Sequence, residues 1–150
     1  MQGRVHVGCC VIAGILLLTA VGCGAQPPLQ SGKRLYDRLG GKPAITAVVD
    51  QFVANVAADN RINGRFATTD IPRLKGHLVD QICAASGGPC TYKGRDMKTT
   101  HAGMKISNAD FSALVEDLVK ALDTYKVPVQ EKNELLGLLA PMKSDIVEVP

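Results

Sequence analysis

The sequence has no tryptophan, and aromatic residues make up only 4% of the chain. With hydrophobic residues at 46%, a core has to be built mainly from Leu, Val, Ile and Ala, which suits helices. Strand-like alternation of apolar and polar residues is missing, and no internal repeat occurs. A length of 150 residues excludes a second large domain. These absences predict one all-helical domain.

Strong net charge and short cofactor motifs are absent as well. Leaving Arg4 out of the 17 basic residues gives 16 against 14 acidic ones, a net charge of +2. That charge is too mild for electrostatic binding of nucleic acid, so no nucleic-acid partner is expected. No C-x-x-C occurs, which excludes a thiol redox motif and a zinc site of that type. No flavin or nicotinamide motif is present.

The amino terminus has the pattern of a targeting segment, so it is not expected to be part of the folded domain. Arg4 gives a positive start, and the apolar run from Val11 to Val21 follows it. This run is short for a transmembrane helix, which needs about 20 apolar residues. It ends in Thr19-Ala20-Val21-Gly22-Cys23, which resembles a bacterial lipobox.

The lipobox resemblance implies that Cys23 carries lipid and attaches the chain to a membrane, although Ala20 stands where Leu is usual. An ordinary signal peptide and an uncleaved anchor are the alternatives, and all three export residues 24–150. No Asp follows Cys23 within two residues, so the lipoprotein sorting rule predicts the periplasmic side of the outer membrane. The expected organisation is a signal peptide at 1–22, a linker at 23–32 and the folded domain at 33–150.

Cysteine counting fits export, because removal of Cys9 and Cys10 and lipidation of Cys23 leave an even pair. That pair, Cys83 and Cys90, is seven residues apart across two glycines and a proline, a spacing that permits a disulfide. The alternative is a small core residue at 83 and a free loop thiol at 90.

Apolar residues recur at helical spacing in four segments. The stripes are Ile45 to Val56 after Gly40-Gly41, Leu74 to Ile82 after Ile71-Pro72, Phe111 to Leu122 after the capping sequence Ser107 to Asp110, and Leu135, Leu138, Leu139, Met142 and Ile146 at the end. Weaker signals place short helices at Tyr36 and at 97–101, and the segment 86–94, with three Gly and one Pro, predicts a loop. A plain four-helix bundle is the structural alternative.

Two histidines follow the leader, His77 on the second of these helices and His101 beyond the glycine loop. Neutral imidazole is the usual protein ligand of haem iron. A lone histidine near an apolar face is nevertheless more often an ordinary side chain. The C-x-x-C-H sequence of covalent haem attachment is also absent, so the two histidines alone are weak evidence for haem binding.

The residues around these histidines resemble the truncated haemoglobins of the N type, the group I or two-on-two globins. The resemblance runs from Leu35 to about Val147. Its ordered pieces are LYDRLGG at 35–41, DNRI at 59–62 with Phe66, RLKGH at 73–77, GGP at 87–89, YKG at 92–94, MKTTH at 97–101 and LLAP at 138–141. It implies an all-α fold in which two helix pairs form a sandwich around haem b.

By this resemblance, His101 takes the proximal ligand position of the haem iron, and His77 the position that binds iron from the distal side in similar cyanobacterial haemoglobins. The apolar residues it assigns to the pocket are Phe52, Phe66, Leu74, Leu78, Ile82, Met97, Ile106, Phe111 and Leu118. Haem is an apolar disc with two carboxylate tails, so its site needs an apolar slot, an axial ligand and a cation at the rim. Candidates for the rim are Lys75, Tyr92, Arg73 and Lys98. The alternative for each is that the side chain only faces solvent and contacts no haem.

The chain departs from the family pattern on the distal side. Many members have a Tyr after the Phe of the second helix and a Gln on the distal helix, where this chain has Val53 and Leu78. Loss of a charge-assisted hydrogen bond costs about 1.5–3 kcal/mol, which puts stable oxygen storage in doubt. Val53 and Leu78 also leave His77 little to displace, so we expect it to bind the iron; the alternative is that it points to solvent.

The expected function is therefore a haem protein of the cell envelope that binds diatomic gases (O2, NO or CO) or passes electrons. Oxidation of nitric oxide to nitrate is the enzymatic version, and it requires an unknown reductase or electron donor. The rival is a haem-free helical lipoprotein acting as an interaction module. It explains the apolar stripes and the anchor, but not the ordered motifs.

Overall fold

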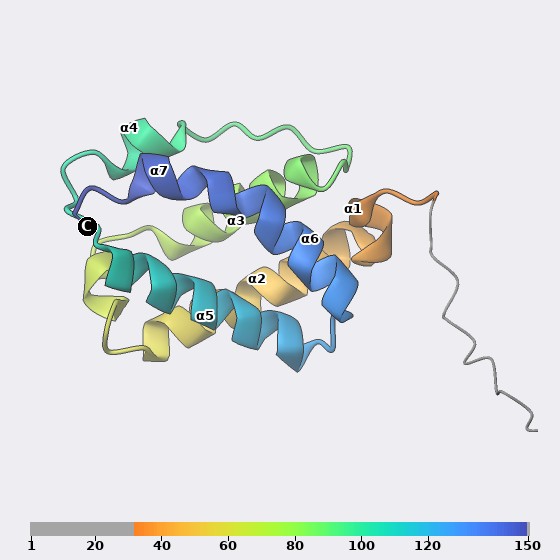
Figure 1. Ribbon diagram of the computed structural model, residues 1–150, viewed down its shortest axis with the longest axis horizontal. Coiled ribbons are helices and arrows are strands. Elements are labelled where there is room, and N and C mark those ends of the chain that lie inside the picture. Colours follow the sequence, from red (N-terminus) through yellow and green to blue (C-terminus); the bar gives the residue numbers. More distant parts are fainter. Residues whose placement is uncertain (1–31, 150) are drawn as a thin grey trace, which may run out of the picture.

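The computed structural model describes residues 32–149 (Figure 1). The expected signal peptide and the lipidation site Cys23 lie outside these residues. The elements are α1 (Leu35–Arg38), α2 (Gly41–Ala58), η1 (Asn63–Phe66), α3 (Ile71–Ala85), α4 (Met97–His101), α5 (Asn108–Thr124), α6 (Val129–Leu139), η2 (Ala140–Met142) and α7 (Lys143–Ile146). Between residues 32 and 149, no helix is both long and apolar enough to cross a membrane.

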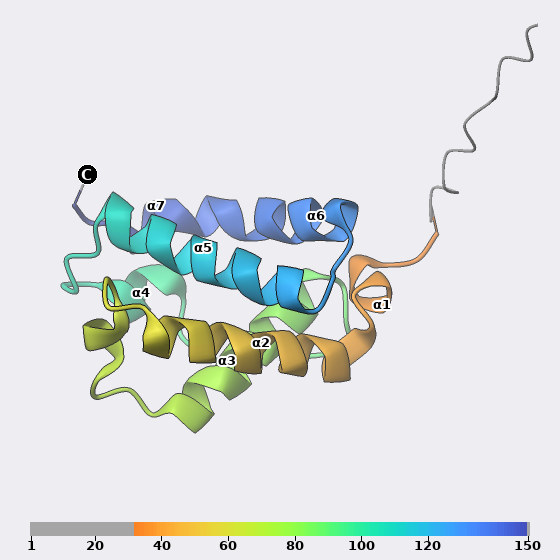
Figure 2. The same ribbon diagram turned by 90° about the horizontal axis from the view of Figure 1, so that it is seen from below.

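The long helices form two layers. α2 packs against α3, and α5 lies beside α6, which continues through η2 into α7; Figure 2 shows the two pairs one above the other. α2 also packs against α5 and so joins the layers. Within the described residues the one β feature is an isolated bridge between Ser107 and Val149. The prediction of an all-helical, two-on-two fold is confirmed.

The core lies where α2, α3, α5 and α6 meet. The stripe predicted on α2 is buried at every position: Ile45, Val48, Val49, Phe52, Val53 and Val56. Its partners include Val79 and Ile82 from α3, Leu118 and Leu122 from α5, and Leu135 from α6. One expectation was wrong, because Leu138 is 41% exposed. α6 is amphipathic, and its core-facing side is defined by Leu135 and the half-buried Leu139.

The start of α5 has the predicted capping box. Ser107 N donates to Asp110 Oδ2 at 2.8 Å, and Asp110 N donates to Ser107 Oγ at 3.1 Å. Arg65 Nη2 from η1 also donates to Asp110 Oδ2, at 2.7 Å. The Ser107 hydrogen bonds and then Arg65 lower the pKa of Asp110 from 3.8 to about 2. Asp110 therefore both caps α5 and ties it to η1.

The loop between α3 and α4 is closed by a disulfide. Cys83 on α3 and Cys90 in the loop are bonded, with Cα atoms 5.7 Å apart, so the first of the two alternatives for this pair holds. Gly88 lies inside the closed ring, where a Cβ would come within 2.6 Å of Cys83 Sγ. Only glycine fits that close approach.

Asp110→Asn should destabilise the protein in a pH-dependent way. The folded pKa lies below the unfolded one, so the carboxylate stabilises the fold above about pH 4 and this contribution is lost as pH falls to about 2. We expect the free energy of unfolding to fall by about 1 kcal/mol at pH 7. Urea denaturation at pH 7, 4 and 2.5 measures it.

The difference between Asp110→Asn and wild type should shrink as the pH falls through that window. Asp145→Asn removes an exposed carboxylate elsewhere and serves as the control. A difference that stays constant from pH 7 to 2.5 would contradict the assigned role of the Asp110 charge.

Candidate functional site

The central element of the site is α4, a helix of five residues. A helix this short is not stable by itself, and none of its residues is fully buried. Its first turn is fixed by Asp96, whose side chain accepts a hydrogen bond from Thr99 N at 2.8 Å. Hydrogen bonds from Thr99 lower the pKa of Asp96, so the cap is charged at neutral pH.

His101 ends α4 with its ring oriented by the backbone. Its Nδ1 lies 2.8 Å from the carbonyl oxygen of Met97. A carbonyl only accepts hydrogen bonds, so Nδ1 carries a proton, and in the neutral ring Nε2 then keeps the lone pair. An imidazole held in this way through its other nitrogen is the usual arrangement of a metal-binding histidine. The half-buried His101 therefore fits haem iron as its ligand.

The segment after His101 is held from two directions. The carboxylate of Glu148 accepts hydrogen bonds from Gly103 N at 2.7 Å and Lys105 N at 2.6 Å, and these bonds lower the pKa of Glu148. Arg65 donates to the Met104 carbonyl at 2.9 Å. Gly103 has a φ of 78°, a left-handed conformation that favours glycine. The turn that leaves α4 is thus fixed by polar contacts.

α3 forms the opposite wall, and Gln81 reaches across from it. Gln81 Nε2 lies 3.6 Å from Met97 Sδ on α4 and 3.4 Å from Met142 Sδ in η2. A thioether is a weak acceptor, so the amide faces an almost apolar surrounding. Gln81 was not among the residues predicted for the site. Its position three residues after Leu78, on the same helix face, was the available signal.

His77 lies on α3 at the edge of the same wall and is half-buried. Arg73 Nε donates to His77 Nε2 at 3.4 Å. The ring of Tyr92 meets the imidazole edge-on, with centroids 6.1 Å apart and planes at 70°. Burial raises the pKa of Tyr92, and its hydroxyl donates to the Arg95 carbonyl at 2.9 Å.

The predicted pocket residues fall into two groups. Phe52, Ile82 and Leu118 belong to the main core, with Phe66 and Leu78 packed against it. Leu74, Met97 and Phe111 are half-buried and Ile106 is buried, outside that cluster. The second group lies on α3, α4 and α5 and in the segment between α4 and α5, where the histidines also lie.

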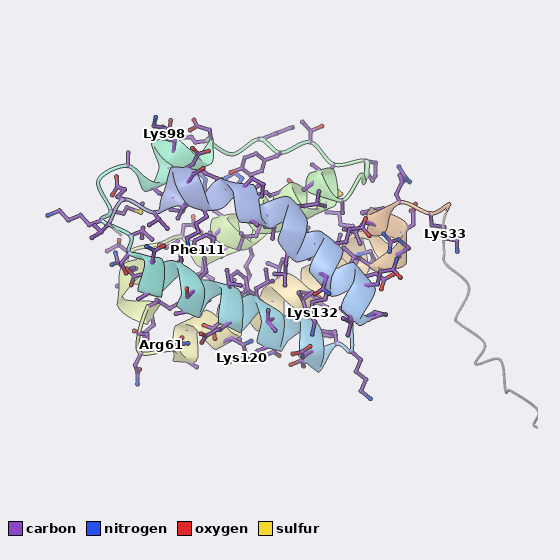
Figure 3. All side chains as sticks on the ribbon, in the orientation of Figure 1. Lys33, Arg61, Lys98, Phe111, Lys120 and Lys132 are labelled. Carbon is purple, nitrogen blue, oxygen red and sulfur yellow. A yellow bond between two sulfur atoms is a disulfide. The ribbon has the colours of Figure 1, made fainter. Side chains whose placement is uncertain are left out.

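The cations predicted for the rim point in different directions. Lys75 Nζ forms an ion pair with Asp50 on α2 at 2.8 Å. Lys98 lies exposed on the outer side of α4, whereas Phe111 points inward from α5 (Figure 3). An open surface depression of about 560 Å³ lies beside α7, and it is lined by Asn108, Ala140, Pro141, Lys143, Ser144, Val147 and Glu148. None of the predicted site residues lines it.

A two-layer helical sandwich with a histidine oriented for metal binding on a short helix is the arrangement expected of a truncated globin. Comparison with protein families matches residues 34–148 to the bacterial-like globins. A group 1 truncated hemoglobin, GlbN, of Mycolicibacterium paratuberculosis is 39% identical over 112 residues, which span 75% of this chain and 82% of that protein. A group 1 truncated hemoglobin of Tetrahymena pyriformis is 32% identical over 113 residues, with 75% and 93% covered.

Solved structures agree with the sequence matches. Truncated hemoglobin from Tetrahymena pyriformis in the Fe(III) form superposes with a TM-score of 0.74 at 31% identity, covering 77% of this chain and 98% of that one. The 2/2 hemoglobin of a Synechococcus species in the cyanomet state, with covalently attached heme, gives 0.72 at 29% identity and the same coverage. The chain belongs to the bacterial-like globin family, among the group 1 truncated hemoglobins. Haem is the cofactor of this family and diatomic gases are its ligands.

Glu148→Ala should weaken the hold on haem without unfolding the domain. The substitution removes the carboxylate that accepts hydrogen bonds from Gly103 N and Lys105 N and so loosens the turn that follows His101. We expect haem to transfer to an excess of apomyoglobin roughly tenfold faster. Glu148→Gln, which keeps one acceptor oxygen, should fall between the two. An unchanged transfer rate with Ala would show that this anchor does not position α4.

Proposed function

We propose that this chain is a gas-binding globin of the cell envelope in which His101 Nε2 holds the haem iron. The observation that carries the proposal is the 2.8 Å contact between His101 Nδ1 and the Met97 carbonyl. It fixes the tautomer and the direction of the ring before any metal is present, which lowers the entropic cost of binding one. Bound haem supplies an iron atom that can coordinate O2, NO or CO.

The residues on the distal side set the preference among these gases. Val53 is buried and Leu78 half-buried, and neither offers a hydrogen-bond donor. A ligand that needs a charge-assisted hydrogen bond loses about 1.5–3 kcal/mol relative to a site that provides one. Gln81 is the amide on this wall, and its contacts are with methionine sulfur. The site therefore favours gases that need little hydrogen bonding, and it is poorly suited to stable storage of O2.

His77 is proposed as the second axial ligand. It lies on α3, eight residues before the end of that helix at Ala85, and one helical turn before Gln81, whose amide reaches Met97 on α4. An imidazole that reaches the iron competes directly with gas. Oxidation of nitric oxide or electron transfer by such a site needs an external electron donor, because no flavin or nicotinamide motif occurs in the sequence.

Export is proposed for the folded part, with Cys23 as the lipid attachment site. The Cys83–Cys90 disulfide supports this proposal, because disulfides persist in oxidising compartments such as the periplasm and are rare in the cytosol. The lipobox-like sequence before Cys23 provides the anchor. Family membership, in turn, argues against the haem-free interaction module.

His101→Ala should abolish stable haem binding, since the iron loses its proximal ligand. We expect little Soret absorbance after reconstitution with hemin, and recovery of a carbon monoxide shift when imidazole is added to the reduced sample. Circular dichroism should show a retained helical fold. If His101→Ala keeps full haem occupancy without imidazole, another residue holds the iron.

Cys23→Ser should release the globin from the membrane. The variant, expressed with the whole leader, is expected in the soluble envelope fraction with its Soret spectrum intact, whereas wild type follows the outer membrane. Metabolic labelling with a palmitate analogue gives the direct readout. A Cys23→Ser product that stays in the membrane fraction would argue for an uncleaved helix instead.

A further inference from the structure

We propose that Arg73 and Tyr92 are positioning residues for His77, which hold its imidazole at the edge of the site and so control whether it reaches the iron. The inference rests on the proposed function and concerns how the distal position is opened and closed. Both residues touch His77, one through a hydrogen bond and one through its ring. We refer to this three-residue contact as the distal clamp.

The contact with Arg73 competes with metal binding for the same atom. Arg73 Nε donates to His77 Nε2 at 3.4 Å, so the Nε2 lone pair points at the guanidinium group. One lone pair cannot accept that proton and bind a metal together. Ligation through Nε2 therefore requires His77 to leave Arg73, which lies one turn earlier on the same helix.

Tyr92 limits the movement of the ring. It meets His77 edge-on, with ring centroids 6.1 Å apart, a favourable aromatic geometry. Its own place is fixed by the hydrogen bond from its hydroxyl to Arg95. Gly94 adds to this, because a Cβ there would overlap the Tyr92 hydroxyl. The Tyr92 ring is thus fixed in position where it packs against the imidazole of His77.

The disulfide connects the clamp to the core. Cys83 is fully buried and is bonded to Cys90, two residues before Tyr92. The bond keeps the loop close to α3, the helix that carries Arg73 and His77. Without it, Tyr92 would depend on a glycine-rich loop for its position.

The clamp sets the fraction of molecules with an open distal face. With haem bound, a His77 held by Arg73 and Tyr92 would leave the distal side open to gas. A released His77 would compete with gas for the iron, and the apparent gas affinity would fall in proportion to the fraction of molecules in which it does so. The contacts of two side chains thereby tune ligand binding without touching the ligand.

The test compares Tyr92→Leu and Arg73→Gln with wild type, each reconstituted with hemin. Each should raise the ratio of six-coordinate low-spin to other ferric haem roughly two- to tenfold, the range of one lost hydrogen bond at Arg73 or one lost aromatic contact at Tyr92. Each should also slow carbon monoxide association after reduction. Cys90→Ala should act in the same direction. Adding His77→Ala to each variant should remove the increase.

Two matched controls separate positioning from general loosening. Tyr92→Phe keeps the ring but loses the hydroxyl contact with Arg95, so its ratio should lie between those of wild type and Tyr92→Leu. Lys93→Gln removes a neighbouring exposed charge and should leave the ratio unchanged. A ratio that does not rise in Tyr92→Leu and Arg73→Gln, or a rise that persists with His77→Ala, overturns the proposal.

A measurement without haem keeps this inference distinct from the proposed function. In the haem-free protein, NMR should show a nuclear Overhauser effect between the rings of Tyr92 and His77, and Tyr92→Leu should move the His77 ring signals. Absence of that effect in wild type also overturns the clamp. Absence of a Soret band in every reconstituted variant would instead refute the proposed function, whatever the NMR result.

Discussion

The arrangement depends on one constraint, which is that His101 lies on a helix too short to hold itself. α4 has five residues and none fully buried, so apolar burial cannot fix it as it fixes α2. Polar contacts do this instead: Asp96 caps its start, Glu148 binds the turn after it, and Arg65 binds the next carbonyl. The position of α4 is thus set by polar contacts at its two ends, and the Met97 carbonyl then orients the His101 ring.

The residues that stabilise the fold are therefore different from those that form the candidate site. The main core, which includes the fully buried Val49, Leu122 and Leu135, joins α2, α5 and α6. It is complete without any residue of α4. The residues near the histidines are mostly half-buried, among them Leu74 and Phe111, and an apolar disc between them would remove further surface from water. Haem can therefore add to the stability of a domain whose core already exists.

Prediction from the sequence succeeded where a local rule decides the structure. The stripe on α2 and the capping box at Ser107 follow from spacing alone. It failed where three-dimensional packing decides. Leu138 shares the spacing of its helix but is exposed. Gln81 was missed because a polar residue in an apolar stripe resembles solvent-facing ones until Met97 and Met142 are brought beside it.

The loop between α3 and α4 links the two sides of the site through one covalent path. It begins on the distal helix beyond His77 and ends at Asp96, the cap of the helix that carries His101. The Cys83–Cys90 bond fixes its first half to the core, and the Tyr92 hydroxyl fixes its second half through Arg95, next to that cap. Because Tyr92 also contacts His77, a movement of this loop would change the surroundings of both His77 and His101. The covalent closure therefore restrains the surroundings of His77 and of His101 at once, although neither histidine touches it.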